Sequence, residues 1–281
     1  MKKKITIVVA LVVLIVAAVS SLFIISFTKK ADMIPVLTYH RLLLEDENKL
    51  YKNQPDVLSV EAFEKQMKWL HDNGYHTMTI DELDQFLNGK REFPAKTVMI
   101  QFDDGRRDVK RYAYSILEKY DLHAIENIIT SRTNRNDGPW NPDKHQFMKM
   151  NEIKDTLGIF ELGAHTDSLH NLGEDGKGDM LKKSDEEILK DLKLNRNRLN
   201  QTELFVYPFG HYTSHTADLV KEAGFKYAFT TKTGYVSPND DPYQLARQGI
   251  GPKVTIKDFE NISEVNSLKN KVNRFVKHIT N

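Results

Sequence analysis

Residues 97–105 read TVMIQFDDG, an apolar run that ends in two adjacent carboxylates and a glycine. The run is short, apolar and closed by a turn signal, so it predicts a buried β-strand over residues 97–102. Asp103 and Asp104 then follow that strand directly. Taken alone, an Asp-Asp-Gly sequence is also common in turns that have no further role.

Similar apolar runs recur along the chain and alternate with helical patterns. Strands are predicted at residues 35–39, 124–130, 159–162, 204–207, 227–230 and 244–247, and helices near 60–73, 80–88, 109–116, 184–199 and 214–223. Helix starts are marked by Ser59 as an N-cap and by Thr79 with Glu82 and Ser184 with Glu187 as capping pairs. This alternation indicates an α/β fold with a mostly parallel sheet, either open or closed into a barrel. Such folds carry their chemistry on the loops after the strands. We therefore expect one rim to collect the residues that directly follow the apolar strands: His40, Asp103, Asp104, His165 and Pro208.

The second informative stretch is AHTDSLH, residues 164–170, which carries His165 and His170. One carboxylate and two imidazoles form a ligand set for a catalytic metal that keeps one coordination position open. The other carboxylate of the Asp pair is then free to act as a base. Two histidines five residues apart are otherwise common on protein surfaces. The chain has no cysteine, so a metal must be held by His, Asp or Glu.

Composition excludes some classes of function. The chain has 281 residues, 40% of them hydrophobic and 28% charged, which suits one large globular domain or two small ones. Its net charge is +1, but residues 1–30 contain five lysines and no acid. The remainder therefore holds 35 basic and 39 acidic residues. A mildly acidic body argues against a nucleic-acid partner.

The N-terminus predicts attachment to a membrane. Three lysines at positions 2–4 precede residues 5–27, a run of 23 residues without a charge, which is long enough to span a bilayer. A cleavable signal peptide would have a shorter apolar core and a better cleavage site than residues 17–20 offer. We expect residues 1–30 to form an uncleaved signal anchor with a transmembrane helix and an extracytoplasmic body. Lys29 and Lys30 on the other flank weaken that orientation, and a cleaved, secreted form is the alternative.

The C-terminal segment, residues 261–281, shows helical periodicity. Val265, Leu268, Val272, Phe275 and Ile279 recur at steps of three and four, which is typical of an amphipathic helix. We expect this helix to pack against the body, and a helix that binds a partner is the alternative.

As an ordered set, these motifs resemble the polysaccharide deacetylases of carbohydrate esterase family 4, the NodB-homology family. FDDG at residues 102–105 is similar to the first motif of the family, the two histidines to the second, and YPFG at 207–210 to the third. The spacing of the histidines, the following Asn171-Leu172, and TYHR at residues 38–41 resemble the biofilm-type poly-β-1,6-N-acetylglucosamine deacetylases. The resemblance covers residues 34–260. It implies a distorted (β/α) barrel, and we assign the catalytic domain to residues 31–260.

The resemblance also implies roles for the residues. Asp104, His165 and His170 would hold a divalent metal, with Zn²⁺ as the default and Co²⁺, Ni²⁺, Mn²⁺ or Fe²⁺ as alternatives. Such a metal polarises the acetamide carbonyl and lowers the pKa of its water to about 7. Asp103 would be the general base. The backbone N–H of Phe209 would stabilise the oxyanion, with Pro208 fixing the backbone that aims it.

Two further catalytic residues are expected. His40 is the candidate acid for the amine leaving group, because the ordinary histidine pKa of about 6.5 suits proton donation. Arg247 resembles the arginine that pairs with the base in related enzymes. The alternatives are a structural histidine and a surface arginine. The C-terminal histidine motif of most family members is absent, since residues 248–251 read QGIG, which leaves the acid step to His40.

Substrate contacts are expected from Tyr207, Pro208, Phe209 and Trp140. Phe209 stands where many family members have Tyr or Trp, so a side-chain contact to sugar is in doubt while a backbone role survives. Trp140 can stack on a sugar ring or shield the core.

The expected function is metal-dependent N-deacetylation of N-acetylhexosamine units in an extracellular or cell-wall polysaccharide, with an exopolysaccharide of the biofilm type favoured. The expected partners are that polysaccharide, the membrane and the machinery of polysaccharide synthesis or export. A peptidoglycan deacetylase is the alternative within the same class. A non-catalytic, membrane-tethered scaffold that binds glycans is the alternative from another class.

Overall fold

The computed structural model describes residues 29–280, with side chains through residue 276. The segment predicted to span the membrane lies outside the described residues apart from Lys29 and Lys30, so that expectation stays a prediction. Between residues 29 and 280, no helix is both long enough and apolar enough to cross a bilayer.

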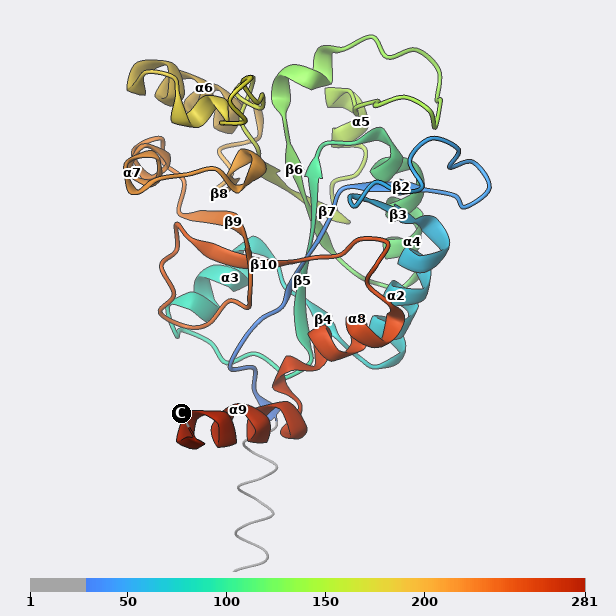
Figure 1. Cartoon of the computed structure of the whole chain (residues 1–281), viewed down its shortest axis with the longest axis vertical. Helices are drawn as coiled ribbons and strands as arrows, with labels where there is room; N and C mark the ends of the chain where they lie inside the picture. The colour runs from blue at the N-terminus through green and yellow to red at the C-terminus, as the bar shows by residue number, and fades with distance from the viewer. Residues whose placement is uncertain (1–28, 281) are drawn as a thin grey trace, which may run out of the picture.

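A parallel sheet that closes on itself forms the centre of the molecule (Figure 1). The strands pair in the order β1-β10-β9-β8-β7-β6-β5, and β1 also pairs with β5, which closes the ring. The short β4 pairs with the amino end of β5, at Thr97 and Val98. The α/β fold with a ring-shaped parallel sheet is thus confirmed. The strands are β1 (Val36–Tyr39), β4 (His76–Thr77), β5 (Thr97–Asp104), β6 (Ala124–Ile128), β7 (Phe160–Ala164), β8 (Leu204–Val206), β9 (Tyr227–Thr233) and β10 (Leu245–Gly249).

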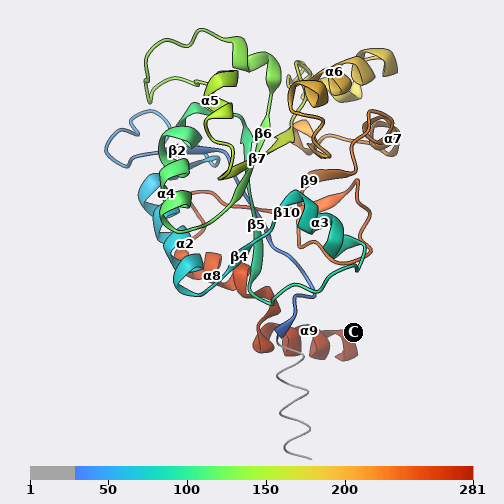
Figure 2. The same cartoon turned by 180° about the vertical axis from the view of Figure 1, so that it is seen from behind.

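Helices surround the ring (Figures 1 and 2). Their predicted N-terminal caps are confirmed: the Ser59 side chain accepts the Ala62 N–H, and Thr79 and Ser184 each form a capping box with the glutamate three residues on. These caps satisfy N–H groups that the first turn of a helix leaves without partners. The helices are α2 (Val60–Asp72), α3 (Ile80–Leu87), α4 (Tyr114–Lys119), α5 (Met150–Lys154), α6 (Asp185–Arg198), α7 (Ser214–Glu222), α8 (Ile256–Ser263) and α9 (Leu268–Thr280), with a π-helical turn, η1 (Val109–Ala113), before α4.

An aromatic cluster joins the first strands to the first helix. Tyr39 of β1, Phe63 of α2 and Phe102 of β5 are fully buried, and their ring centroids lie 5.2–5.5 Å apart. Contacts at these distances add to the free energy of burial. Because Tyr39 and Phe102 immediately precede His40 and Asp103, this packing fixes the positions from which two of the expected catalytic residues project.

Two features differ from expectation. Three short strands, β2 (Arg41–Leu43), β3 (Val57–Ser59) and β4, were not predicted, because two or three residues show no periodicity. The expectation that the C-terminal apolar residues pack on the body is wrong for most of them. Val265 is buried in the 3₁₀ turn η5 (Glu264–Asn266), but Leu268, Val272 and Phe275 of α9 are 42%, 46% and 64% exposed.

Candidate functional site

A pocket of about 230 Å³ lies at the carboxyl ends of the strands, where the fold is expected to place chemistry. Its walls come from loops and strand ends that are far apart in the sequence. Nine of the ten lining residues come from β1, β5, β7, β8, β9 and β10 or from the loops that follow them, and Asp56 comes from the loop between β2 and β3. The lining residues are His40, Asp56, Asp103, Asp104, His165, His170, Tyr207, Phe209, Thr231 and Arg247.

The Asp pair belongs to the last two residues of β5 rather than to the loop after it. In a regular strand, consecutive side chains point to opposite faces. Asp104 has a φ of 83°, in the left-handed region that non-glycine residues rarely adopt. This turn of the backbone lets Asp103 and Asp104 line the same pocket. Thr166 (φ 66°) and Phe209 (φ 58°), after β7 and β8, share this strained conformation, which is common at functional sites.

Asp104, His165 and His170 come together as the residues of a metal site. Each offers one ligand atom, and these atoms all lie within 4.8 Å of one another. The Asp104 Oδ1 atom is 3.8 Å from His165 Nε2 and 3.5 Å from His170 Nε2, and the two Nε2 atoms are 3.0 Å apart. The three side chains are 4–17% exposed, so a small ion can reach them only through the pocket.

The protonation of the two histidines suits a metal. His165 Nδ1 lies 2.8 Å from the Val206 carbonyl oxygen. Because a carbonyl oxygen can only accept a hydrogen bond, Nδ1 carries the proton and Nε2 keeps a lone pair that can bind a metal. Burial lowers the pKa of His165, and burial together with nearby His165 lowers the pKa of His170 to about 3. Both imidazoles are therefore neutral near pH 7, as metal ligands must be. Two neutral imidazoles and one carboxylate fit a divalent metal of the zinc type.

Asp103 is buried beside the ligand group and held by a network inside the ring. Arg247 Nη1 lies 2.9 Å from each of its carboxylate oxygens, and Asn127 Nδ2 donates to Oδ1 at 2.8 Å. Burial alone raises the pKa of Asp103, but the charge and the hydrogen bond of Arg247 outweigh that effect, with His165 and His40 acting in the same direction, and the pKa is held well below its usual range. The carboxylate therefore stays ionised and can accept a proton.

His40 lies on the solvent side of Asp103. Its Nε2 atom is 3.8 Å from Asp103 Oδ2, and the side chain is 37% exposed, so it can meet a substrate that enters the pocket. The next residue explains why His40 is held there. Arg41 is 1% exposed and its Nε is 3.3 Å from Asp108 Oδ2, while Asp108 Oδ1 accepts the Leu42 N–H. This buried pair fixes the backbone on the carboxyl side of His40.

The loop after β8 forms the opposite wall. Pro208 is buried and Phe209 is 37% exposed, with its ring centroid 4.5 Å from that of His170. The ring therefore covers one side of the second histidine ligand. The left-handed conformation at Phe209 lies within the turn Pro208–Gly210.

Two of the predicted substrate contacts are largely engaged by other parts of the protein. Tyr207 lines the pocket, but its side chain is fully buried and its hydroxyl donates to the Tyr243 carbonyl at 3.1 Å, so the ring packs in the core. Trp140 lines a separate hollow with Arg107, Lys110, Arg111 and Glu152. There it makes an edge contact with Tyr112 and lies under Arg111, as the packing alternative describes, and its contact with sugar stays a prediction.

Several residues of the site were not predicted. Asn127 donates to Asp103, and Asp108 pairs with Arg41 and Arg106 beneath the surface of the pocket. Asp56 and Thr231 line the pocket itself. Asn127 carried one usable signal, since it is an amide within an apolar strand, where a polar group needs a partner.

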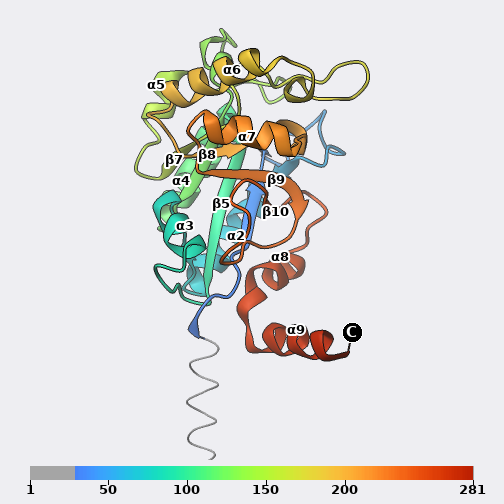
Figure 3. The ribbon, with the colours of Figure 1, turned by 90° about the vertical axis from the view of Figure 1, so that its left-hand side faces the viewer.

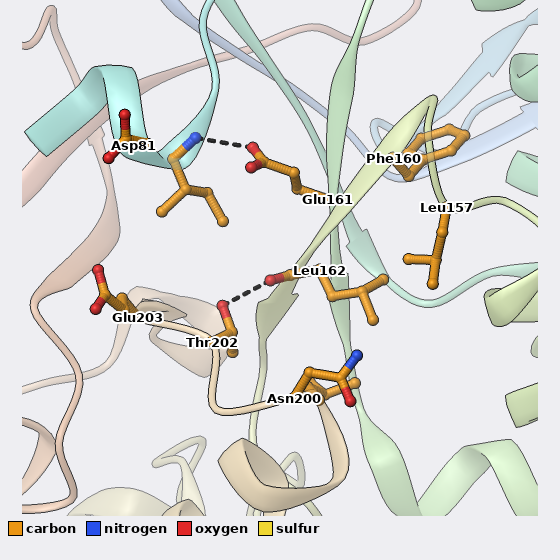
Figure 4. A pocket seen from close by; sticks show the side chains of 10 residues that line it. Asp81, Leu157, Phe160, Glu161, Leu162, Asn200, Thr202 and Glu203 are labelled. Carbon is orange, nitrogen blue, oxygen red and sulfur yellow. Dashed lines mark hydrogen bonds between the residues drawn. The ribbon is translucent and has the colours of Figure 1, made fainter.

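A larger hollow of about 400 Å³ lies near the amino ends of β7 and β8 (Figure 4). It contains the carboxylates of Asp81, Glu161 and Glu203, but no histidine is among its lining residues. The Glu161 carboxylate accepts the Ile80 N–H at 2.8 Å, and the Thr202 hydroxyl donates to the Leu162 carbonyl at 2.6 Å. Because these groups form hydrogen bonds that connect neighbouring segments, we assign a structural role to this hollow. We assign the chemistry to the smaller pocket.

Known proteins resemble the chain across this region. A model of the family described as polysaccharide deacetylase matches residues 90–228. A poly-β-1,6-N-acetyl-D-glucosamine N-deacetylase of Staphylococcus aureus is 32% identical over 197 residues, which cover 68% of this chain and 66% of that relative. The chain thus spans just under two thirds of that relative's length. A putative polysaccharide deacetylase of Bacillus subtilis, YxkH, is 28% identical over 226 residues, or 80% of this chain and 74% of that protein.

Solved structures show the same fold. The deacetylase PplD of Streptococcus pyogenes, in complex with acetate, has a TM-score of 0.71 and 23% identity, and the match covers 82% of this chain and 98% of that one. IcaB from Ammonifex degensii has a TM-score of 0.71 and 24% identity, with 84% of this chain and 98% of that one covered. At this level of identity the likeness establishes the ring-shaped α/β architecture.

Proposed function

Because the chain belongs to the polysaccharide deacetylase family, we propose that it hydrolyses the acetamide of N-acetylhexosamine units in a polysaccharide and requires a divalent metal. One observation carries the proposal. Asp104, His165 and His170 present three ligand atoms within 4.8 Å of one another, and the ionised Asp103 lines the same pocket. A binding module would have no use for a buried base next to an open ligand group.

The chemistry divides between a metal and the side chains of the pocket. A metal held by Asp104, His165 and His170 would polarise the acetamide carbonyl and acidify water; Zn²⁺ suits the ligand set best. Asp103 accepts the proton of the attacking water at its carboxylate, which Arg247 and Asn127 hold in place. The water oxygen adds to the carbonyl carbon, and the backbone N–H of Phe209 donates to the oxygen that becomes negative.

His40 completes the reaction. The C–N bond breaks, acetate forms, and the departing nitrogen takes a proton to become the free amine. His40 is exposed to the pocket and lies 3.8 Å from Asp103, so it can deliver that proton to a bound sugar. This position favours the acid role over a purely structural one.

The role of His40 has a specific test. An amide needs a proton on its leaving group, whereas an aryl acetate leaves without one. We expect His40→Gln to lower kcat for N-acetyl substrate by about 10²-fold or more, but to change aryl acetate hydrolysis by less than about tenfold. Equal losses on the two substrates would exclude His40 as the acid. His76→Gln, at a histidine paired with Glu82 outside the pocket, is the control.

For the substrate, we favour a poly-β-1,6-linked N-acetylglucosamine exopolysaccharide, on the basis of the named activity of the staphylococcal relative. The test compares β-1,6-linked N-acetylglucosamine oligomers with purified peptidoglycan, and measures free amine and acetate in both. We expect equal amounts of the two products and a kcat/KM at least about tenfold higher on the oligomers. A preference for peptidoglycan would replace the substrate but keep the chemistry. Polymer binding without acetate release under any divalent metal would favour the scaffold.

We further propose that the chain is anchored in the cell membrane with its catalytic domain outside the cytoplasm. The support is the uncharged run at residues 5–27, preceded by three lysines. Anchoring would let the enzyme act on polymer as it leaves the export machinery. Full-length protein should stay with membranes under alkaline extraction and be digested by protease added to spheroplasts. A shortened, freely secreted chain would show that the segment is cleaved instead.

A further inference from the structure

The last helix, α9, is attached to the body by its polar side. Lys271 is 3% exposed, and its Nζ donates to the Lys30 carbonyl at 2.8 Å and lies 2.9 Å from Asp32 Oδ2. Arg274, on the next turn, reaches the same Asp32 carboxylate and donates to the Val265 carbonyl. An amphipathic helix on a globular body normally turns its apolar side inward. Here the polar side is inward.

The apolar side of α9 consequently faces outward. We call Leu268, Val272 and Phe275 the outer stripe; they lie four and three residues apart and therefore share one side of the helix. Their side chains are 42%, 46% and 64% exposed. Aligned apolar side chains that stay exposed mark an interaction surface more often than scattered ones do.

The position of α9 indicates what covers this stripe. Asn266, two residues before the helix, accepts the N–H groups of Asp32 and Met33 and donates to the Met33 carbonyl. The helix is thereby tied to residues 30–33, which lead back to the uncharged run at residues 5–27. Figures 1 and 3 show α9 across one end of the long axis, at the opposite end from α6 and α7.

The charge of α9 narrows the choice of partner. Its 13 residues, LKNKVNRFVKHIT, contain four Lys or Arg and no acidic residue. Lys271 and Arg274 are bound to Asp32, and Lys269 is exposed next to Leu268 of the outer stripe. Basic residues beside an apolar stripe are typical of helices that lie in the interface of a bilayer containing anionic lipids. A helix fixed close to a segment long enough to span the membrane would be held at that interface.

We propose that α9 lies on an anionic lipid bilayer, with the outer stripe inserted among the lipid headgroups and upper acyl chains. The attachment through Lys271 and Asn266 then holds the catalytic domain at a set orientation to the membrane. In Figure 1 the arrowhead of β5 points away from α9, so the pocket at the end of that strand faces away from the lipid. This placement suits an enzyme that receives a polymer. The inference rests on α9 and on the proposed anchor at residues 5–27, and not on the catalytic proposal.

The chain is well suited to a labelling test, because it contains no cysteine. Val272→Cys and Phe275→Cys place a nitroxide label on the outer stripe. Asn273→Cys places it at an exposed position on another side of the same helix, and Leu50→Cys at a residue that is 66% exposed elsewhere. All four full-length variants are reconstituted in phosphatidylglycerol-containing vesicles at about one chain per vesicle. Their collision rates with a water-soluble nickel chelate and with lipid-soluble oxygen are then measured.

The proposal predicts that the labels at Val272 and Phe275 lose accessibility to the nickel chelate by about fivefold or more and gain accessibility to oxygen, while those at Asn273 and Leu50 do not. Unchanged accessibility at the outer stripe would overturn it. Protection from nickel without a gain in oxygen would mean that residues 1–28 cover the stripe. Protection that appears only at many chains per vesicle would mean that a second copy covers it. Either of these results would also overturn the proposal.

Discussion

The neighbouring carboxylates of Asp103 and Asp104 are assigned different roles, because the left-handed backbone at Asp104 directs its side chain to different partners from those of Asp103. Asp103 points into the ring, where Arg247 and Asn127 bind it and it is 2% exposed. Asp104, at a φ of 83°, turns instead toward His165 and His170. The protein donates hydrogen bonds to Oδ1 of the first carboxylate and leaves lone pairs on Oδ2, which faces His40. The second carboxylate faces the two histidines, where an ion would lie.

Substituting each aspartate by asparagine should separate these tasks. We expect Asp103→Asn to keep its metal and to lose about 10²–10⁴-fold in kcat, because only the base is removed. Asp104→Asn should lose both metal and activity, because an amide is a poorer ligand than a carboxylate. Metal content and acetate release are measured on the same samples. An Asp103→Asn protein that loses its metal would show that Asp103 is itself a ligand.

At this scale the sequence predicted which residues gather at the pocket but not what supports them. His40, Asp103, Asp104 and His165 meet in one pocket, as their positions at strand ends suggested, and His170 and Arg247, expected from the motifs and the resemblance, join them. Asn127 and Asp108 were missed, because their role depends on which strands become neighbours. The burial of Tyr207 and the place of Trp140 outside the pocket could not be predicted, because a buried aromatic residue and one that stacks on sugar look alike in a sequence.

Between elements, the closeness of β6 and β7 holds the base in position. Gly163 of β7 pairs with Asn127 of β6. A Cβ atom at Gly163 would lie 2.0 Å from Asn127 Oδ1 and 2.9 Å from Leu204 Cδ2. The glycine therefore makes room for the amide that donates to Asp103.

A matched pair of glycines tests this contact. Gly163→Ala should displace Asn127, lower the free energy of unfolding by about 1–3 kcal/mol and reduce kcat. Gly249, the last residue of β10, has nothing within 4 Å of an added Cβ, so Gly249→Ala should stay within about 1 kcal/mol of wild type. Urea unfolding and acetate release measure the two effects. Similar behaviour of both variants would show that the space beside Asn127 is unimportant.

The existence and the start of a helix were predicted well where the sequence signal is local. The side of a helix that faces the body was predicted poorly. The capping boxes at Thr79 and Ser184 identified helix starts correctly, because the signal is local. The direction of α9 was predicted wrongly, because periodicity shows that a helix has an apolar side but not what lies against that side. Lys271 and Asp32 decide its orientation, and they are 239 positions apart in the sequence.

Over the whole molecule, closure of the ring assembles the catalytic residues. β1 pairs with β5 on one side and with β10 on the other. His40 after β1, Asp103 of β5 and Arg247 of β10 therefore meet, although Asp103 and Arg247 are 144 residues apart. Strand alternation alone left an open sheet and a closed barrel equally acceptable. Only the resemblance to the family favoured closure, and the ring-shaped sheet confirms it.

Stability should fall in mild acid because of a histidine far from the pocket. Burial lowers the pKa of His123 to about 4, from the ordinary value of about 6.5. Between these values the unfolded chain binds the proton and the folded chain does not, so the free energy of unfolding decreases as pH falls. From pH 7 to 4.5 this histidine should account for about 2 kcal/mol.

Replacing this histidine checks the direction of the effect. His123→Gln cannot titrate, so urea unfolding should show a shallower loss of stability between pH 6.5 and 4.5 than in wild type. At pH 7 the two proteins are compared to correct for any change in packing. An unchanged slope would place the acid sensitivity in other groups.

The central claim is that Asp104, His165 and His170 hold a metal on which deacetylation depends. The most direct measurement strips the full-length protein with chelator and follows acetate release from N-acetylglucosamine oligomers as Zn²⁺ is titrated back. We predict no release without metal and a linear rise that ends at about one equivalent per chain, as one three-ligand site requires. Full acetate release by the metal-free protein, or an equal response from Asp104→Asn, would contradict the claim.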